Sequence, residues 1–180
     1  MDSVHVKSLF SIDIVVDKLN IKSKVQCYFP SIAFRILDFP TLIINHVEPS
    51  VGKKIKMKIS MDHLFRLKNQ LNELKDNEGS FPVKKGKSCL IQMDAKTLLN
   101  LLQNTPVYVM VVDIFHDPPK LVGNSTIPLD STMQKLYDQI SSFGLAVPSL
   151  QGEKGNYSLY NLMGIEIGTV SIGLNASSID

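Results

Sequence analysis

The chain has 180 residues, a formal net charge of +2 and 44% hydrophobic residues. That apolar fraction excludes general disorder, and the small net charge excludes a partner attracted by the charge of the whole molecule. Two cysteines, Cys27 and Cys89, give no disulfide framework, so we expect a reducing, intracellular setting. No apolar stretch has the length of a signal peptide or a membrane-spanning helix, and one soluble domain over residues 1–180 is expected.

The first third of the chain is rich in β-strand patterns. Residues 9–19 alternate between apolar and polar side chains, and residues 32–37 and 41–47 are two further β-rich runs. In residues 53–59, KKIKMKI, alternation predicts a strand with lysines on one face and apolar residues on the other. Such a lysine face is typical of a solvated edge strand; its functional interpretation is a basic stripe that binds a polyanion, either a phospholipid surface or an acidic protein tail.

An amphipathic helix is expected to follow, near residues 61–75, with Ser60 as its N-cap and leucines at helical spacing. Residues 84–87 hold a second small basic cluster, and residues 88–93 favour a strand. Residues 94–103 fit either a short helix or a turn and strand, since periodicity does not decide between them.

The last third of the chain contains one more predicted helix and a closing hairpin. Residues 131–143 carry apolar side chains at helical spacing, and residues 144–155 are expected to form a loop. Residues 157–162 and 165–174 resemble two strands joined near Gly164. About eight strands at this spacing, with helices in the connections, predict an all-β antiparallel β-sandwich.

The most informative stretch is residues 107–129. A buried strand ends at Asp113, a turn with two prolines follows, and Gly123 stands in the next strand where a bulge or a close backbone approach is expected. The stretch resembles the signature of C2 domains, in which a strand ending in aspartate precedes a ligand-binding loop and a strand of the form hydrophobic-Gly-x-x-x-Ile-Pro-Leu. The resemblance implies a C2-like fold.

Calcium-dependent C2 domains bind the ion with several loop aspartates, and such a hard cation takes roughly six to eight oxygen ligands. The candidate loops here offer Asp113, Asp117 and Asp17, with Asp38 as a less certain neighbour, while Phe115 stands where a further acid would be expected. These scattered carboxylates are too few for tight binding, so we expect no bound metal and no calcium dependence.

No pattern of residues indicates catalysis. The sequence has no cysteine and histidine at metal-ligand spacing, no glycine-rich phosphate loop and no nucleophile elbow. A Cys89 nucleophile with His116 as its base is conceivable, but Cys89 lies within an apolar strand pattern that favours a buried, inert thiol. We therefore expect no enzyme activity and no cofactor.

Several collinear segments resemble the amino-terminal domain of the microtubule-associated protein 10 family. The most specific is AFRILDFPTL at residues 33–42; the others lie at residues 9–11, 86–90, 98–108, 121–123, 157–161 and 164, and in the closing strand. The resemblance implies a non-enzymatic cytoskeletal role in the cytoplasm, on microtubules, at spindle poles and centrosomes, and at the midbody in cell division and cytokinesis. The resemblance identifies no residues of this chain that contact a partner.

The candidate binding residues are chosen on electrostatic grounds, because the acidic tails of tubulin would attract clusters of lysines. The lysines of the two basic clusters are the candidates: Lys53, Lys54, Lys56, Lys58, Lys84, Lys85 and Lys87. The expected partner is tubulin or a cytoskeletal scaffold protein, and no nucleic acid. One alternative is a peripheral membrane module that binds anionic lipid, for which Ile114 and Phe115 alone qualify as inserting residues; another is a structural domain that packs against a longer chain.

Overall fold

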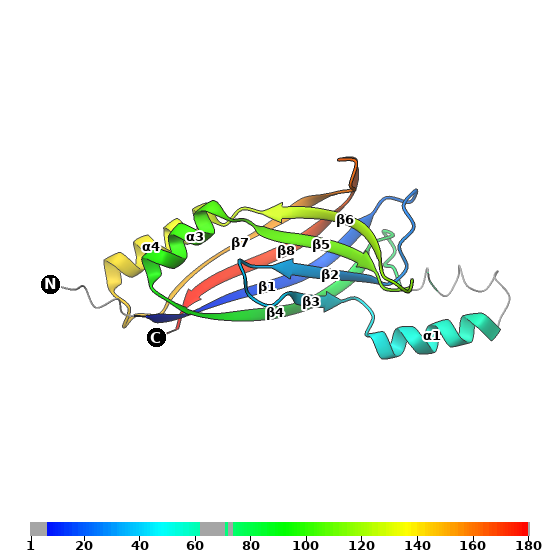
Figure 1. The fold of residues 1–180 in the computed structure, drawn as a ribbon, viewed down its shortest axis with the longest axis horizontal. Helices are drawn as coiled ribbons and strands as arrows, with labels where there is room; N and C mark the ends of the chain where they lie inside the picture. Colours follow the sequence, from blue (N-terminus) through cyan, green and yellow to red (C-terminus); the bar gives the residue numbers. More distant parts are fainter. Residues whose placement is uncertain (1–6, 62–70, 72–73, 180) are drawn as a thin grey trace.

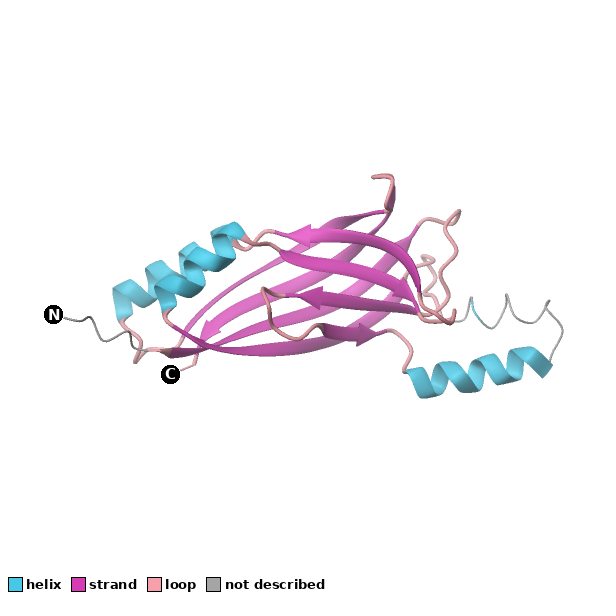
Figure 2. Ribbon diagram, viewed as in Figure 1, coloured by secondary structure: helices cyan, strands magenta, loops and turns pink. Residues whose placement is uncertain are grey.

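The computed structural model describes residues 7–61, 71 and 74–179. Every strand pairing in it is antiparallel. The strands are β1 (Ser8–Ile21), β2 (Pro30–Arg35), β3 (Leu42–Asn45), β4 (Phe81–Met93), β5 (Val107–Asp113), β6 (Lys120–Ile127), β7 (Ser149–Tyr160) and β8 (Glu166–Ser178). The expectation of an all-β antiparallel fold of about eight strands is confirmed (Figures 1 and 2).

The strands form one hydrogen-bonded sheet in the order β3-β2-β5-β6-β7-β8-β1-β4, which folds over on itself as a sandwich. The sheet passes from one layer of the sandwich to the other between β6 and β7, which pair through Asn124 and Tyr160. The β5–β6 register shifts beside Gly123, as the sequence predicts. A Cβ at Gly123 would lie 2.9 Å from Ile167 Cδ1 and 3.2 Å from the Tyr160 carbonyl oxygen, so glycine permits this close approach of the two layers.

The inward-facing side chains of both layers form one core. Alternation along β1 and β8 buries one side chain in two, including Ile12, Ile14, Val170 and Ile172, while the intervening residues face outward. The core also takes in the buried faces of two helices, α3 (Ala95–Asn104) and α4 (Asp130–Phe143). These helices cover one end of the sandwich (Figure 2).

Helix α3 resolves the alternative that periodicity left open for residues 94–103. The Asp94 carboxylate accepts a hydrogen bond from the Thr97 N–H at 3.0 Å and caps the helix. Leu98, Leu99 and Leu102 are buried on one face of it. Helix α4 confirms the helix predicted at residues 131–143.

Helix α1 (Pro49–Met61) overturns the predicted strand at residues 53–59. The alternation there spans only seven residues, whereas Pro49 suits the first turn of a helix and lysine is a good helix former. Ile55 packs against a small core at the end of the sandwich, away from the main core. Ser60 lies inside α1 and does not begin a helix, so its N-cap role is wrong; most of the helix predicted near residues 61–75 lies outside the described residues.

The predicted loop at residues 144–155 is also wrong in its second half, because β7 begins at Ser149. This part of β7 has few β-branched or apolar residues, and its pairing with β8 from Ser149 to Tyr160 determines its conformation. The closing hairpin turns at Gly164, whose φ is +76°, as predicted. In the part of the chain that is described, no helix is long and apolar enough to cross a membrane.

Candidate partner-binding surface

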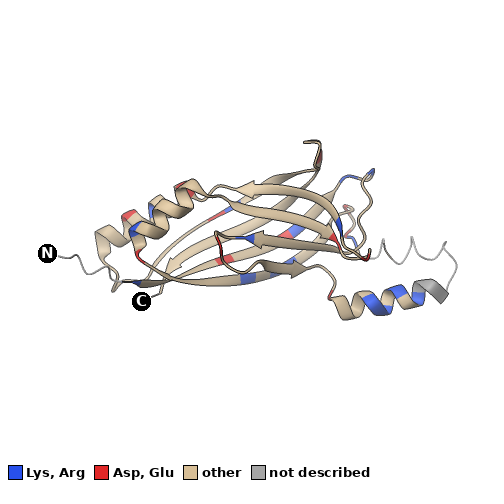
Figure 3. Cartoon of the chain, viewed as in Figure 1, with Lys and Arg blue, Asp and Glu red and all other residues tan. Residues whose placement is uncertain are grey.

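Helix α1 projects from the opposite end of the sandwich to α3 and α4 and carries four of the predicted lysines (Figures 1 and 3). Lys53, Lys54 and Lys58 are exposed, and we refer to these three residues as the α1 basic face. Met57, on the same side of the helix, is 68% exposed. Lys56 is half-buried, with its Nζ 4.9 Å from the centroid of the Phe115 ring, so its charge is engaged with that aromatic face.

The position of α1 is fixed by a small apolar cluster. Phe29, Val47 and Leu71 are buried there, and Ile55 packs against them. A Cβ at Gly52 would lie 3.5 Å from the Phe29 ring, so the helix backbone passes close to that ring. The cluster lets one side of α1 pack on the domain while the three lysines of the α1 basic face remain exposed.

Lys85 differs from the other predicted lysines because its ammonium group is used in the fold. Its Nζ donates to the carbonyl oxygens of Asn45 at 2.8 Å and His46 at 3.3 Å, and it lies 3.2 Å from a Glu48 carboxylate oxygen. These contacts join β4 to the end of β3, the two extremes of the strand order. Lys85 thus stabilises the closure of the sandwich.

The other β4 lysines are exposed. Lys84 has a positive φ of 47°, where β4 shifts register against β1, and Lys87 lies beyond Lys85 along the strand. The seven predicted lysines therefore form two groups, one on α1 and one on β4. The Lys85–Glu48 contact places β4 beside the start of α1.

Asp113, the leading calcium-ligand candidate, is fully buried and hydrogen-bonded to the backbone. Its carboxylate accepts from the N–H groups of Tyr28 at 3.0 Å, Phe29 at 2.9 Å and Phe115 at 3.0 Å. His116 Nε2 lies 3.7 Å from the same carboxylate. Asp113 therefore holds the end of β5 against the start of β2, and its oxygens are occupied.

The other acidic candidates, Asp17 and Asp117, are exposed, one in β1 and one in the β5–β6 loop. Among the described residues, no group of three or more histidine, cysteine, aspartate or glutamate side chains is placed to hold a metal ion. The structure does not bring Asp17, Asp113 and Asp117 together.

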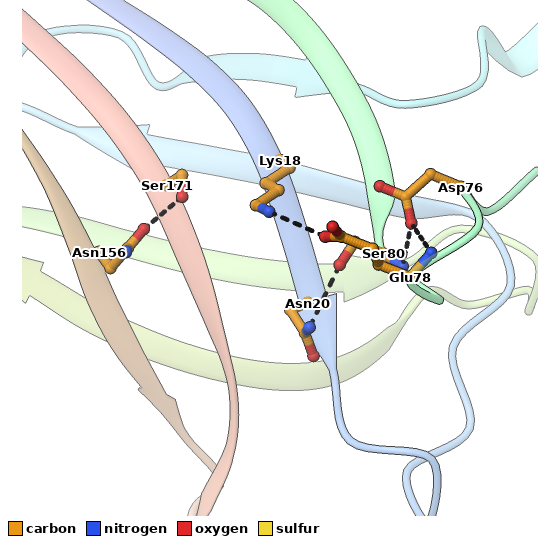
Figure 4. Close-up of polar contacts among 7 residues, drawn as sticks. All are labelled: Lys18, Asn20, Asp76, Glu78, Ser80, Asn156 and Ser171. Carbon is orange, nitrogen blue, oxygen red and sulfur yellow. Dashed lines mark hydrogen bonds and ion pairs between the residues drawn. The ribbon is translucent and has the colours of Figure 1, made fainter.

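The outer face of the β7-β8-β1 layer is hollowed, and its lining mixes glycines with polar, charged and apolar side chains, such as Asn156, Lys154 and Leu150. Two of its lining residues are bonded to each other, since the Ser171 hydroxyl donates to Asn156 (Figure 4). The same view shows Lys18, which does not line the hollow, 3.3 Å from Glu78. In the loop before β4, the Asp76 carboxylate accepts from the N–H groups of Glu78 and Ser80. This hollow has no sequence signature beyond strand alternation and was not predicted. Its charged lining residues, Asp17, Glu153 and Lys154, are of mixed sign, so it is a weaker candidate than α1 for an acidic partner.

Neither cysteine has the surroundings of a nucleophile. Burial, followed by the nearby Asp113 charge, strongly raises the pKa of the Cys27 thiol. Cys89 is half-buried, not fully buried as expected, and desolvation raises its pKa as well. Raised pKa values keep both thiols protonated, which is consistent with structural roles.

The residues expected to insert into a membrane are not free. Phe115 contacts the rings of Tyr28 and Phe29 at centroid distances of 4.9 and 5.4 Å, and Ile114 packs in the same cluster. Among the residues that the structure describes, the most exposed large apolar side chains lie instead in the β7–β8 turn, where Leu162 and Met163 are 82% and 84% exposed. In the sequence, two large apolar residues directly before Gly164 could have identified this exposed turn.

The amino-terminal domain of microtubule associated protein 10 matches residues 26–177, which is most of the chain. The chain belongs to this family. Microtubule-associated protein 10 of Bos taurus is 30% identical over 155 residues, covering 83% of the chain and 14% of that protein. The chain thus spans about one seventh of the length of this relative.

Solved structures with a similar fold share little sequence. One described as "CC2D1B coordinates ESRCT-III activity during the mitotic reformation of the nuclear envelope" has a TM-score of 0.51 at 7% identity, over 91% of this chain and 53% of that one. A C2 domain of plant Extended Synaptotagmin 1 has a TM-score of 0.49 at 8% identity, over 93% of each chain. At these identities the likeness concerns the fold alone.

Proposed function

We propose that this domain is a non-catalytic, microtubule-associated interaction module that contacts an acidic partner through the α1 basic face. The observation that carries the proposal is the exposure of Lys53, Lys54 and Lys58 on a helix projecting from one end of the sandwich. Membership of the microtubule-associated protein 10 family supports tubulin as that partner. The exposed Lys84 and Lys87 extend the same charge along β4.

Physical chemistry favours the helix over the strand as the main contact. Three exposed ammonium groups within two turns of α1 create a local positive potential, although the net charge of the chain is only +2. Acidic tubulin tails would meet this potential without a shaped pocket. An interaction of this kind weakens as salt screens the charges.

The proposed function also includes independence from calcium and a place in the cell. We infer a calcium-independent domain, since the Asp113 oxygens are already hydrogen-bonded to the backbone. We also propose a cytoplasmic location on the cytoskeleton, with a role at the spindle, centrosome and midbody in cell division. These places follow from the family resemblance and apply to the longer proteins that carry the domain.

Co-sedimentation of the purified chain with stabilised microtubules, at increasing salt, tests the contact. The triple variant K53E/K54E/K58E should lose most of its binding, and wild-type binding should weaken with salt. The matched control, K96E/K135E/K154E, changes the net charge equally at exposed lysines of α3, α4 and β7 and should bind like the wild type. Equal losses in both variants, or unchanged binding of the α1 variant, would contradict a specific role for α1.

A further inference from the structure

The outer face of the β3-β2-β5-β6 layer, whose strands β2, β5 and β6 lie in front in Figure 1, carries an ordered row of side chains. Directly opposed residues of antiparallel strands point to the same face, with their Cβ atoms about 4.5–5.5 Å apart. The strand registers place five residues in one such row, each opposite the next: Ile43, Ala33, Met110, Asn124 and Tyr160. The row therefore runs without a break from β3 to the end of β7.

The large side chains of this face are exposed. Ile43 and Met110 are each 45% exposed and Tyr160 is 42% exposed. Tyr108, two residues before Met110 and therefore on the same face of β5, is 51% exposed. Large apolar side chains that share one exposed face of a folded domain mark an interaction site, and tyrosine and methionine are enriched where proteins meet.

One cationic side chain, Arg35, accompanies the row. Arg35 lies directly opposite Tyr108, is exposed, and has no hydrogen-bond or ion-pair partner among the described residues. Asp113 is the one acid in the four strands of this layer, and it is fully buried. The guanidinium beside the apolar side chains is therefore available to pair with a carboxylate from outside the molecule.

A hollow opens at the end of the row, where β6 and β7 diverge from their single paired position. Its volume is about 370 Å³, and Asn124, Thr126 and Tyr160 are among the residues that line it. Asn124 and Tyr160 also belong to the row, so the row leads directly into the hollow. Protein interfaces concentrate their binding energy in large side chains that fill such pockets.

We propose that this face binds an amphipathic α-helix of a partner protein. The apolar side chains of that helix pack on Ile43, Tyr108 and Met110, and one aspartate or glutamate beside its apolar stripe pairs with Arg35. This inference goes beyond the proposed function, because the face contains no residue of the α1 basic face.

The geometry of the face favours a helix over the other possible occupants. Four strand spacings of about 4.8 Å make the row about 19 Å long, which is the length of a helix of about 13 residues. The middle of a sheet face offers no free backbone groups, so an extended peptide would lose its hydrogen bonds with water there, whereas a helix keeps its own. A second copy of this chain would bring no carboxylate to Arg35, since the one acid of the layer is buried.

A displayed library of amphipathic helices of about 14 residues, randomised along the apolar stripe and its flanks, is the probe. Selection against the intact chain should enrich helices with an apolar stripe and an acid beside it. The affinity of these helices should fall about tenfold or more for Y108D/M110D, because a charge then replaces each apolar contact. The control L90D/L150D changes two leucines that are 61% and 59% exposed on the other layer, and it should bind like the wild type.

A charge exchange tests the contact with Arg35. The variant R35E should bind the selected helices about tenfold more weakly, and replacing their acid with lysine should restore the affinity for R35E while lowering that for the wild type. Recovery of binding in the exchanged pair also shows that R35E is folded, so loss of binding cannot be attributed to unfolding.

Three further results separate this face from the alternatives. Y108D/M110D should bind microtubules like the wild type, and the wild type should sediment as a monomer. A wild-type dimer that Y108D/M110D dissociates would assign the face to a second copy, and reduced microtubule binding of that variant would place the microtubule contact here; either result would overturn the proposal. A selection without binders, binders that are insensitive to Y108D/M110D, or failure of the charge exchange would also overturn it.

Discussion

The carboxylate of Asp113 accepts a hydrogen bond from the backbone N–H of Phe29 at 2.9 Å, across 84 residues of sequence. The same fully buried carboxylate bonds the N–H groups of Tyr28 and Phe115. It therefore joins the end of β5 to the start of β2, next to the ring cluster that supports α1. A residue that resembles a calcium ligand in the sequence stabilises the loop end of the sandwich.

Replacing Asp113 with alanine should lower the free energy of unfolding by about 3 kcal/mol or more, because each buried donor left unpaired costs about 1–3 kcal/mol. Asp113→Asn keeps one acceptor oxygen and should cost less. Urea denaturation followed by circular dichroism measures both. An alanine variant as stable as wild type would contradict the structural role of this carboxylate.

Calcium should not bind saturably at micromolar concentration. The Asp113 oxygens are committed to three backbone N–H groups, so binding an ion there would require breaking those bonds. Isothermal titration calorimetry of the wild-type chain is the measurement, with magnesium as a comparison. A saturable calcium isotherm that D17N/D117N abolishes would contradict this expectation.

Lys85 and Lys87 should behave differently although both were predicted as partner contacts. Lys85→Met removes the bonds to Asn45 and His46 and should reduce the free energy of unfolding by about 1–2 kcal/mol. Lys87→Met removes an exposed side chain, for which changes usually stay within about 0.5 kcal/mol. Thermal denaturation of the two variants, compared at equal salt, distinguishes them, and equal midpoints would contradict this assignment.

His46 should make stability depend on pH. Burial, opposed by the hydrogen bond with the Leu74 carbonyl and reinforced by the Lys85 charge, lowers the pKa of His46 below 6.5. The unfolded chain then binds a proton more readily, so the His46 contribution is fully present above pH 6.5 and is lost as pH falls through the folded-state pKa.

The urea midpoint should therefore fall as the pH is lowered below 6.5. The variant His46→Gln keeps a side-chain N–H group but does not titrate, so its midpoint should fall less over the same range. Identical pH profiles for the two proteins would show that another group is responsible.

Gly123→Ala should destabilise the junction of the two layers by about 1–3 kcal/mol, since the added Cβ would lie 2.9 Å from Ile167 Cδ1 and 3.2 Å from the Tyr160 carbonyl. Gly173→Ala is the control, because its nearest neighbour would be Lys154 Cγ at 3.6 Å. In an Ile167→Val background the cost at residue 123 should shrink but not vanish. Chemical denaturation of the single and double variants provides the test, and an additive result would exclude the Ile167 contact.

Residues with a strong local pattern were predicted correctly, and those whose pattern is short or weak were not. Strands β1 and β8 alternate over many residues, β5 is a continuous apolar run that ends at Asp113, and the apolar side chains of α4 repeat at helical spacing, so the local pattern was sufficient. The KKIKMKI segment fits a strand over seven residues, yet it lies in a helix of 13 residues that begins at Pro49. Residues 149–155 carry little β propensity, and pairing with β8 decided their conformation.

The sequence by itself determined the antiparallel β fold, the family and the positions of the lysines, because alternation and collinear motifs are properties of the chain alone. Tertiary structure decided what each charged or apolar group is free to do. Lys85 and Asp113 are hydrogen-bonded to backbone groups distant in sequence, and Phe115 packs against two other rings. The apolar side chains of the β7–β8 turn, in contrast, are exposed to solvent. Burial and hydrogen bonding depend on neighbours brought together by folding, and no local pattern specifies them.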